Sequence, residues 1–170
     1  MNLILLSGPP ASGKTTLRNR LIKSGTIISP DNYIGYNRSN PWTPKVAKFA
    51  WKKADELLLE SLKRGDSIIV FDATLVNFKR RKKYIELGKK FGATVICMYC
   101  SASKHLILKR NDARDEFRKV PEVVMGRMIG SFVSPDKEEG FDFIVHYDSE
   151  YDRFDGDVKK VMDLIEGKYA

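Results

Sequence analysis

The sequence predicts an α/β protein with a central, mostly parallel sheet of five strands that carries helices on both faces. Short apolar runs alternate with longer segments of helical periodicity along the 170 residues. The runs are continuously apolar, which is typical of strands that are buried on both faces of a parallel sheet. Strands that alternate with helices at this spacing indicate helical layers above and below the sheet. A chain of this length fits one ordinary domain, so we expect residues 1–170 to form a single three-layer unit.

The predicted strands are the apolar runs. The first, NLILLSG, ends at Gly8 and leads directly into a helical segment. The third, SIIVFDA, brings Asp72 to its carboxyl end. Isoleucine, valine and phenylalanine dominate these runs and favour extended backbone. We expect strands at residues 2–8, 26–29, 67–73, 93–99 and 141–147.

Helical spacing of apolar side chains marks the segments between the strands. The longest begins at Thr43–Pro44, a capping residue followed by proline in the first turn. Its apolar positions continue until Gly65, which suits a helix end. We expect helices at residues 14–23, 43–65, 77–91, 103–117, 121–133 and 156–167.

The charge of the chain is unevenly distributed. The net formal charge is +8, but residues 1–135 carry +14 and residues 136–170 carry −6. A basic body favours a polyanionic partner, although a basic surface also serves solubility alone, and charge leaves both interpretations open. No apolar run approaches the roughly 18 residues of a membrane span, and the first run lacks the basic leader of a signal peptide. We expect a cytoplasmic protein with no membrane partner, in which Cys97 and Cys100 are buried thiols.

One motif indicates a nucleotide site. The segment GPPASGKTT at residues 8–16 matches G-x-x-x-x-G-K-[ST] and lies between a predicted strand and a predicted helix. Its glycines let successive backbone N–H groups curl around an anion, and the start of the helix adds a favourable dipole. Lys14 would reach the β- and γ-phosphates of ATP, and the Thr15 hydroxyl would join the Mg²⁺ shell. The predicted ATP contacts in this loop are Gly8, Ala11, Ser12, Gly13, Lys14, Thr15 and Thr16.

Two aspartates favour phosphoryl transfer over hydrolysis. Asp72 is followed by Ala73 instead of a second acid, and no evident water-activating glutamate comes after it. Asp72 is a candidate for the metal or the acceptor site and, equally, an ordinary turn residue. Asp31 lies just past the second predicted strand, at the edge where ligands bind to open α/β sheets. A carboxylate there can take the proton of an acceptor hydroxyl, so Asp31 is the candidate general base.

The triplet Ser-Pro-Asp occurs twice, and only the first copy suits catalysis. Asp31 in SPDNY follows the phosphate-loop helix and one further strand, whereas Asp136 lies in the polar run SPDKEEG. Both triplets are good turn sequences. Position alone separates them, so we expect Asp136 to be a surface turn residue.

Cationic side chains follow in two groups. Arg110, Arg114 and Arg118 recur at intervals of four and would share one face of a continuous helix. They could stabilise the charge of a transferring phosphoryl group, or pair with neighbouring acids on a solvated surface. The run KRRKK at residues 79–83 begins just past the third predicted strand. It could hold the phosphates of a trailing nucleic-acid strand, or face solvent as an ordinary basic helix.

The order of these motifs resembles the kinase domain of the phage polynucleotide 5′-kinase. The motifs are SGKTT at 12–16, DNY at 31–33, DAT at 72–74, KRN at 109–111 with Arg114, and VP at 120–121, all within residues 2–135. The resemblance implies the three-layer P-loop kinase fold with a helical lid at about 103–120. It implies Asp31 as general base, Lys14 and Arg114 as further catalytic residues, and Arg110 beside Arg114 above the ATP phosphates. The implied reaction transfers the ATP γ-phosphate to the 5′-hydroxyl of DNA or RNA.

One departure from the family leaves the acceptor open. The family usually has an arginine three residues after the base, where it binds the 3′-phosphate of the acceptor, and this chain has Ile34 there. Arg38, or a lysine from residues 45–52, could replace it, so the predicted acceptor contacts are Asp31, Arg38 and Asp72. The alternative is a P-loop kinase of a small-molecule hydroxyl (nucleoside, sugar or antibiotic). A nucleotide-binding regulatory or nucleic-acid-binding module without catalysis is a more remote alternative.

Overall fold

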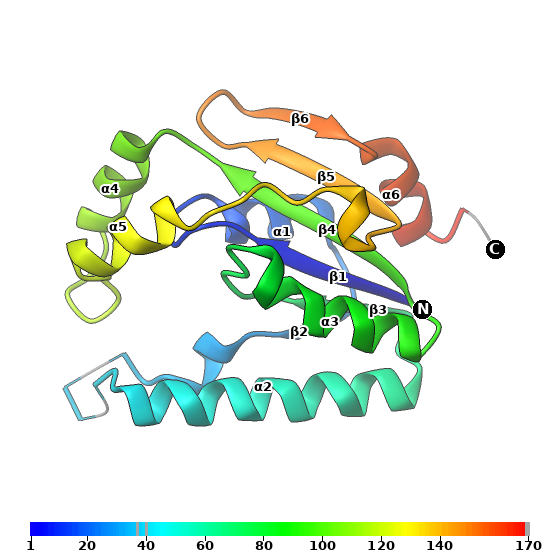
Figure 1. Cartoon of the computed structure of the whole chain (residues 1–170), viewed down its shortest axis with the longest axis horizontal. Coiled ribbons are helices and arrows are strands. Elements are labelled where there is room, and N and C mark those ends of the chain that lie inside the picture. Colours follow the sequence, from blue (N-terminus) through cyan, green and yellow to red (C-terminus); the bar gives the residue numbers. More distant parts are fainter. Residues whose placement is uncertain (37, 40, 169–170) are drawn as a thin grey trace.

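The computed structural model describes residues 1–36, 38–39 and 41–168, and these residues form one sheet of six strands. The strands are Asn2–Ser7 (β1), Thr26–Ile28 (β2), Ile68–Phe71 (β3), Thr94–Ser101 (β4), Phe143–Asp148 (β5) and Arg153–Gly156 (β6). Their order across the sheet is β2-β3-β1-β4-β5-β6 (Figure 1). Neighbouring strands are parallel, except that β6 runs antiparallel to β5.

Helices cover both faces of this sheet. They are Lys14–Leu21 (α1), Pro44–Arg64 (α2), Phe78–Lys90 (α3), Lys104–Asp112 (α4), Glu122–Gly130 (α5) and Val158–Ile165 (α6). Leu58 of α2 and Tyr84 of α3 share one core with Leu3 of β1. Leu17 of α1 belongs to the core of the other face, with Ile4. Leu3 and Ile4 serve opposite cores because successive side chains of a strand point to opposite faces.

Two helices stand apart from these layers. In Figure 1, α4 and α5 lie beyond the end of the sheet at which β4 terminates. This is the carboxyl end of the parallel strands, where the predicted site residues also gather. No helix in the part of the chain that the structure describes is long and apolar enough to cross a membrane.

The predicted fold class is confirmed, and the main difference is a sixth strand. β6 consists of RFDG, and three of its four residues are exposed. A short polar strand at the edge of a sheet shows no apolar pattern, so the sequence analysis assigned its last residue to a helix. The C-terminal helix begins at Val158 instead of residue 156.

The predicted helix at 103–117 is wrong beyond residue 112. α4 ends at Asp112, where the chain turns back because the buried Asn111 binds the backbone of Val120 in both directions. Its side-chain amide donates to the Val120 oxygen at 2.8 Å, and its side-chain oxygen accepts from the Val120 N–H at 3.0 Å. Arg110 therefore lies on α4, whereas Arg114 and Arg118 lie in the connection to α5. The three arginines do not share a helix face.

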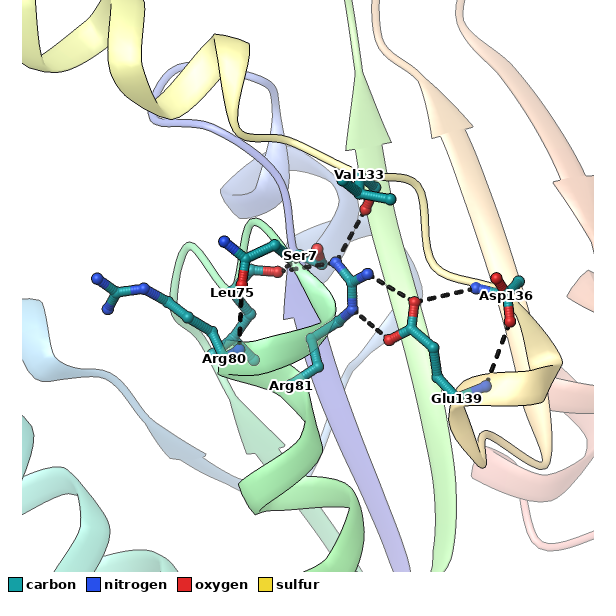
Figure 2. Close-up of polar contacts among 8 residues, drawn as sticks. Ser7, Leu75, Arg80, Arg81, Val133, Asp136 and Glu139 are labelled. Atoms are coloured by element: carbon teal, nitrogen blue, oxygen red, sulfur yellow. Dashed lines mark hydrogen bonds and ion pairs between the residues drawn. The ribbon is translucent and has the colours of Figure 1, made fainter.

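The residues of the basic run at 79–83 differ in how far they are buried. Arg81 is fully buried, and its guanidinium binds both carboxylate oxygens of Glu139, at 2.6 and 2.7 Å (Figure 2). It also donates to the backbone oxygens of Leu75, at 3.1 Å, and Val133, at 3.0 Å. In Figure 2 the side chain of the adjacent Arg80 extends away from this network. Neither predicted role of the run, phosphate binding or a solvated face, applies to Arg81.

Candidate active site

A cleft of about 1060 Å³ lies beyond the carboxyl ends of the parallel strands. Its walls come from the loops after β1, β2 and β3 and from the segment that includes α4 and α5. Ligands bind at this edge of open α/β sheets. The volume is at the upper end of the range for one small ligand, so the cleft has room for a nucleotide and part of an acceptor. The predicted site residues that line it are Ala11, Gly13, Lys14, Thr15, Thr16, Asp31, Asp72, Arg110 and Arg114.

The loop between β1 and α1 has the backbone geometry that an anion site needs. Gly8 and Gly13 have φ angles of 145° and 108°, which residues with side chains rarely adopt. A Cβ atom at Gly8 would lie 2.9 Å from the backbone oxygen of Cys100. A Cβ atom at Gly13 would lie 2.8 Å from the side chain of Ser149. Both glycines are thus needed for close packing as well as for the turn.

Ser12 indicates that this loop can receive a ligand. Its hydroxyl oxygen is buried and has no hydrogen-bond partner in the described part of the chain. Such a group is costly unless something bonds to it, and phosphate oxygens are strong acceptors. α1 begins at Lys14, and the first residues of this helix, Lys14, Thr15 and Thr16, line the cleft. The loop therefore fits the phosphates of ATP.

Lys14 is held inside the loop by backbone oxygens. Its ammonium group donates to the oxygens of Gly8 and Pro9, both at 2.8 Å. Burial lowers the pKa of Lys14, and the negative charge of Asp72 acts in the opposite direction. Charged phosphate oxygens form stronger hydrogen bonds with an ammonium group than neutral carbonyls do. Lys14 is accordingly placed to bind a phosphate that enters the loop.

Asp72 follows β3 and binds Arg18 of α1, with 2.6 Å between Nη1 and Oδ2. Burial raises the pKa of Asp72, while Lys14 and Arg18 oppose that rise. Among the described residues, no group of three or more His, Cys, Asp or Glu side chains could hold a metal. Mg²⁺ is usually bound through substrate phosphates and one or two carboxylates. The residues present fit Mg²⁺ bound together with ATP, through the Thr15 hydroxyl and with Asp72 near it.

Asp31 lies in a single 3₁₀ turn, Pro30–Tyr33 (η1), directly after β2. The Ser29 hydroxyl caps this turn by accepting from the Asp31 N–H at 3.3 Å. That carboxylate accepts a hydrogen bond from the Tyr36 hydroxyl at 2.8 Å. Burial, together with the charge of Asp31, raises the pKa of Tyr36, so the phenol keeps its proton. Asp31 thus binds a hydroxyl group within the cleft, which is the contact that a general base makes with its acceptor.

Arg110 connects α4 to the phosphate loop. Its guanidinium donates to the Ser149 hydroxyl at 2.7 Å, to the Ser149 backbone oxygen at 3.0 Å and to the Ala11 oxygen at 3.4 Å. The Ser149 hydroxyl donates in turn to the backbone oxygen of Ser12 at 2.7 Å. Arg114 also lines the cleft, although it lies outside α4. The two predicted lid arginines therefore reach the same cleft from different local structures.

The acceptor side of the cleft, defined here as the part around Asp31, contains two arginines beyond the predicted acceptor contacts. Ile34 lines the cleft and is buried, so its position carries no charge. Arg38 is exposed and is not one of the lining residues. Arg80 and Arg127 do line the cleft. The basic run contained a signal for Arg80, but no sequence signal distinguished Arg127.

Aromatic side chains complete the acceptor side. Trp42 and Trp51, the only tryptophans of the sequence, both line the cleft. Tyr36 and Phe117 line it as well. Trp42 is 56% exposed, which is unusual for so large an apolar side chain. Aromatic rings beside arginines are the combination on which nucleic-acid bases and phosphates bind.

Comparison with protein families assigns the domain. A family model described as an AAA domain (AAA_33) matches residues 3–135. The chain belongs to this family. The matched region of the AAA domain includes the phosphate loop, Asp31, Asp72 and both lid arginines. The P-loop kinase domain expected from the sequence is thereby confirmed, whereas the phage-type substrate stays a prediction.

The AAA domain is similar to the L-seryl-tRNA(Sec) kinase of Methanococcus maripaludis, with 30% identity over 145 residues. The alignment covers 82% of this chain and 56% of the relative, so the chain spans about half the length of that kinase. Kti12 of Chaetomium thermophilum, solved with ADP-AlF3, is similar in structure, with a TM-score of 0.64 and 17% identity over 99% of each chain. A chain of the Pnkp1/Rnl/Hen1 RNA repair complex has a TM-score of 0.62 and 18% identity, over 76% of this chain and 43% of that one. At these identities the two solved structures show the shared fold alone.

Proposed function

We propose that this AAA domain transfers the γ-phosphate of ATP to a hydroxyl group carried by a nucleic acid. The observation that carries the proposal is the contact of Asp31 with a hydroxyl in the same cleft as Lys14. The cleft thus contains a phosphate-binding loop on one side and a carboxylate that binds a hydroxyl on the other. The relative that is named for a tRNA substrate supports a nucleic-acid acceptor.

The nucleotide side of the cleft binds and orients ATP. The backbone of residues 8–16 surrounds the phosphates, and Lys14 contributes the nearest positive charge in the loop. Arg114 would bind the equatorial oxygens of the transferring group from the opposite wall. Mg²⁺, when bound with ATP, neutralises part of the charge of the β- and γ-phosphates. The protein groups hold this charge in a fixed geometry, so little reorganisation is needed during transfer.

The acceptor side supplies the base. Asp31 takes the proton of the acceptor hydroxyl while the oxygen of that hydroxyl forms its bond to the γ-phosphorus and the bond to ADP breaks. The Tyr36 hydroxyl occupies Oδ1 of that carboxylate, and an acceptor hydroxyl that binds at Oδ1 displaces it. The second oxygen, Oδ2, can also accept a hydrogen bond. General-base assistance of this kind contributes roughly 10²–10⁴-fold to the rate.

Two nucleic-acid acceptors are candidates. The first is the 5′-hydroxyl of DNA or RNA, which the ordered motif set of the sequence favours. The second is the seryl group of a seryl-tRNA, which is favoured by the 30% identity to the L-seryl-tRNA(Sec) kinase. Both acceptors present a primary alcohol that is carried by a polynucleotide, so the same cleft chemistry serves either.

Transfer of label from γ-labelled ATP, with Mg²⁺, tests the proposal. The acceptors are 5′-hydroxyl oligonucleotides of DNA and RNA, single- and double-stranded, seryl-tRNA, and a set of nucleosides, sugars and aminoglycosides. Oligonucleotides that already carry a 5′-phosphate, and tRNA without serine, are the matched controls. Label on 5′-hydroxyl ends supports the first candidate, and label on seryl-tRNA alone supports the second. Label only on small molecules overturns the nucleic-acid acceptor, and no transfer to any acceptor overturns the kinase activity.

A further inference from the structure

Tyr36 presents a hydroxyl group to the candidate base from within the chain itself. Its phenol donates to Oδ1 of Asp31 at 2.8 Å, and both residues line the cleft that also contains Lys14. A reacting hydroxyl makes the same contact with a general base, at about 2.6–3.2 Å between the heavy atoms. On the side of the base, Tyr36 therefore meets the geometric requirement for a phosphoryl acceptor.

The base and the phosphate-binding lysine lie within electrostatic reach of each other. Burial lowers the pKa of Lys14, whereas the charge of Asp31 is near enough to oppose that change. Burial raises the pKa of Tyr36, and the charges of Arg118 and Arg114 oppose that rise. The charge of Arg114 also contributes to the lowered pKa of Lys14. Arg114 is thus near the phosphate loop and the Tyr36 phenol at once, which places the phenol on the side of the cleft where an ATP bound at Lys14 carries its γ-phosphate.

Contacts at both ends hold the Tyr36 side chain in this place. Its hydroxyl binds Asp31, and the guanidinium of Arg118 lies over its ring, 5.7 Å from the ring centre. The φ angle of Tyr36 is 47°, in the left-handed region that side chains other than glycine rarely adopt. Such a conformation persists where the surrounding structure favours it. The half-buried Tyr36 is therefore a fixed occupant of the acceptor side of the cleft.

We propose that the Tyr36 hydroxyl is itself a phosphoryl acceptor, so that the protein phosphorylates itself at this residue. The inference rests on the transfer chemistry of the proposed function but requires no external acceptor. The phenol oxygen forms a bond to the γ-phosphorus of ATP, the phenol proton passes to Asp31, and the bond from the γ-phosphorus to the bridging oxygen breaks to release ADP. Because burial raises the pKa of Tyr36, the phenol does not ionise unaided at neutral pH and depends on the base.

The phosphorylated side chain would be bound by the arginines of the same wall. Phosphotyrosine carries about −1.5 to −2 charges at neutral pH and three strong acceptor oxygens. The Asp31 carboxylate repels this group, whereas Arg118 already contacts the ring and Arg114 lines the same cleft. The modified Tyr36 then stays on the acceptor side of the cleft. Self-phosphorylation therefore lowers transfer to external acceptors.

Incubation with γ-labelled ATP and Mg²⁺, without any acceptor, tests the inference. Label and intact mass should show one added phosphoryl group, and fragment mass spectra should place it on Tyr36. Tyr36→Phe should lose the label, and Asp31→Asn should slow labelling by roughly 10²–10⁴-fold. Tyr33→Phe is the matched control and should label like the wild type, because Tyr33 lies in the same segment but does not line the cleft. Label at another residue, or a rate constant that rises with protein concentration, overturns the inference.

Parallel reactions with external acceptors separate this inference from the proposed function. Label on a nucleic acid, by a protein that stays unlabelled, overturns self-phosphorylation and keeps the proposed function. Label on Tyr36 without label on any nucleic acid overturns the nucleic-acid acceptor and keeps this inference, and no label on either overturns both. Where both are labelled, incubation with ATP before the acceptor is added should lower the later transfer in proportion to the phosphorylated fraction, and this loss should be absent in Tyr36→Phe. Undiminished transfer by the phosphorylated protein overturns the blocking of the cleft.

Discussion

The two Ser-Pro-Asp triplets consist of the same residues and differ in what their aspartates bind. In the first, Ser29 caps the turn, and Asp31 lies inside it with a carboxylate that is free to bind Tyr36. In the second, Asp136 is itself the cap of the turn Lys137–Glu139 (η2), and its carboxylate accepts from the Glu139 N–H at 3.2 Å. The residue that caps the turn is the first of the triplet in one case, Ser29, and the last in the other, Asp136. That difference decides whether the aspartate binds backbone or faces the cleft.

The second triplet has a structural role of its own. Its capping box includes a return hydrogen bond from the Asp136 N–H to the Glu139 carboxylate, at 3.3 Å. This contact helps to orient the carboxylate that neutralises the buried Arg81 (Figure 2). The expectation that Asp136 is an exposed turn residue is confirmed. The comparison predicts that changes in the first triplet affect catalysis and changes in the second affect stability.

The largest effect is expected for Asp31→Asn. The amide cannot take the acceptor proton, so kcat should fall by roughly 10²–10⁴-fold. ATP affinity and the free energy of unfolding should stay near their wild-type values, because Asp31 is exposed and its carboxylate binds a side-chain hydroxyl. Kinetics with saturating ATP, together with urea denaturation, measure both properties. An Asn variant with wild-type kcat would remove the role of Asp31 as base.

Glu139→Ala, in the network of the second triplet, should lower stability instead of kcat. It leaves the Arg81 charge buried without its partner, which typically lowers the free energy of unfolding by about 3–5 kcal/mol. Urea denaturation provides the measurement. Glu138→Ala is the control, because Glu138 is exposed in the same turn, and it should change stability by no more than about 0.5 kcal/mol. Equal effects of the two variants would contradict a stabilising role of the ion pair.

Asp136→Ala tests the second triplet itself. Loss of the cap should lower the free energy of unfolding by about 1 kcal/mol, with no change in kcat measured on the folded protein. Asp136→Asn serves as the control, since asparagine is also a good cap and should retain most of that stability. A loss of kcat in the Ala variant without a loss of stability would show that the two triplets are not separated in function.

The smallest effect is expected for Tyr36→Phe in the first triplet's network. The phenyl ring keeps the packing of Tyr36 but does not donate to Asp31. An acceptor that binds at the same carboxylate oxygen no longer has to displace that hydrogen bond, which contributes about 0.5–1.5 kcal/mol, so the acceptor KM should fall by a few-fold. Steady-state kinetics over a range of acceptor concentrations measure this. An unchanged or raised KM would mean that Tyr36 does not compete with the acceptor.

Local signals were sufficient for the phosphate loop and for the long apolar strands. The glycines at 8 and 13, Lys14 and Thr15 are fixed by the chemistry of phosphate binding within nine consecutive residues, 8–16. Features that depend on distant partners were not predictable in this way. The end of α4 depends on Asn111 and a backbone nine residues further along the chain, and the burial of Arg81 depends on a carboxylate 58 residues away. Arg127 reaches the cleft only because the chain after α5 is bound to the start of α3.

The Ser149 hydroxyl couples two parts of the site mechanically. It accepts from Arg110 of α4 and donates to the backbone oxygen of Ser12 in the phosphate loop, at 2.7 Å in each case. Gly13 lies so close to Ser149 that there is no space for a side chain between them. An outward movement of α4 has to break these hydrogen bonds or pull the loop with it. Under the proposed kinase function, an opening movement of α4 that keeps these hydrogen bonds would displace the phosphate loop at the same time.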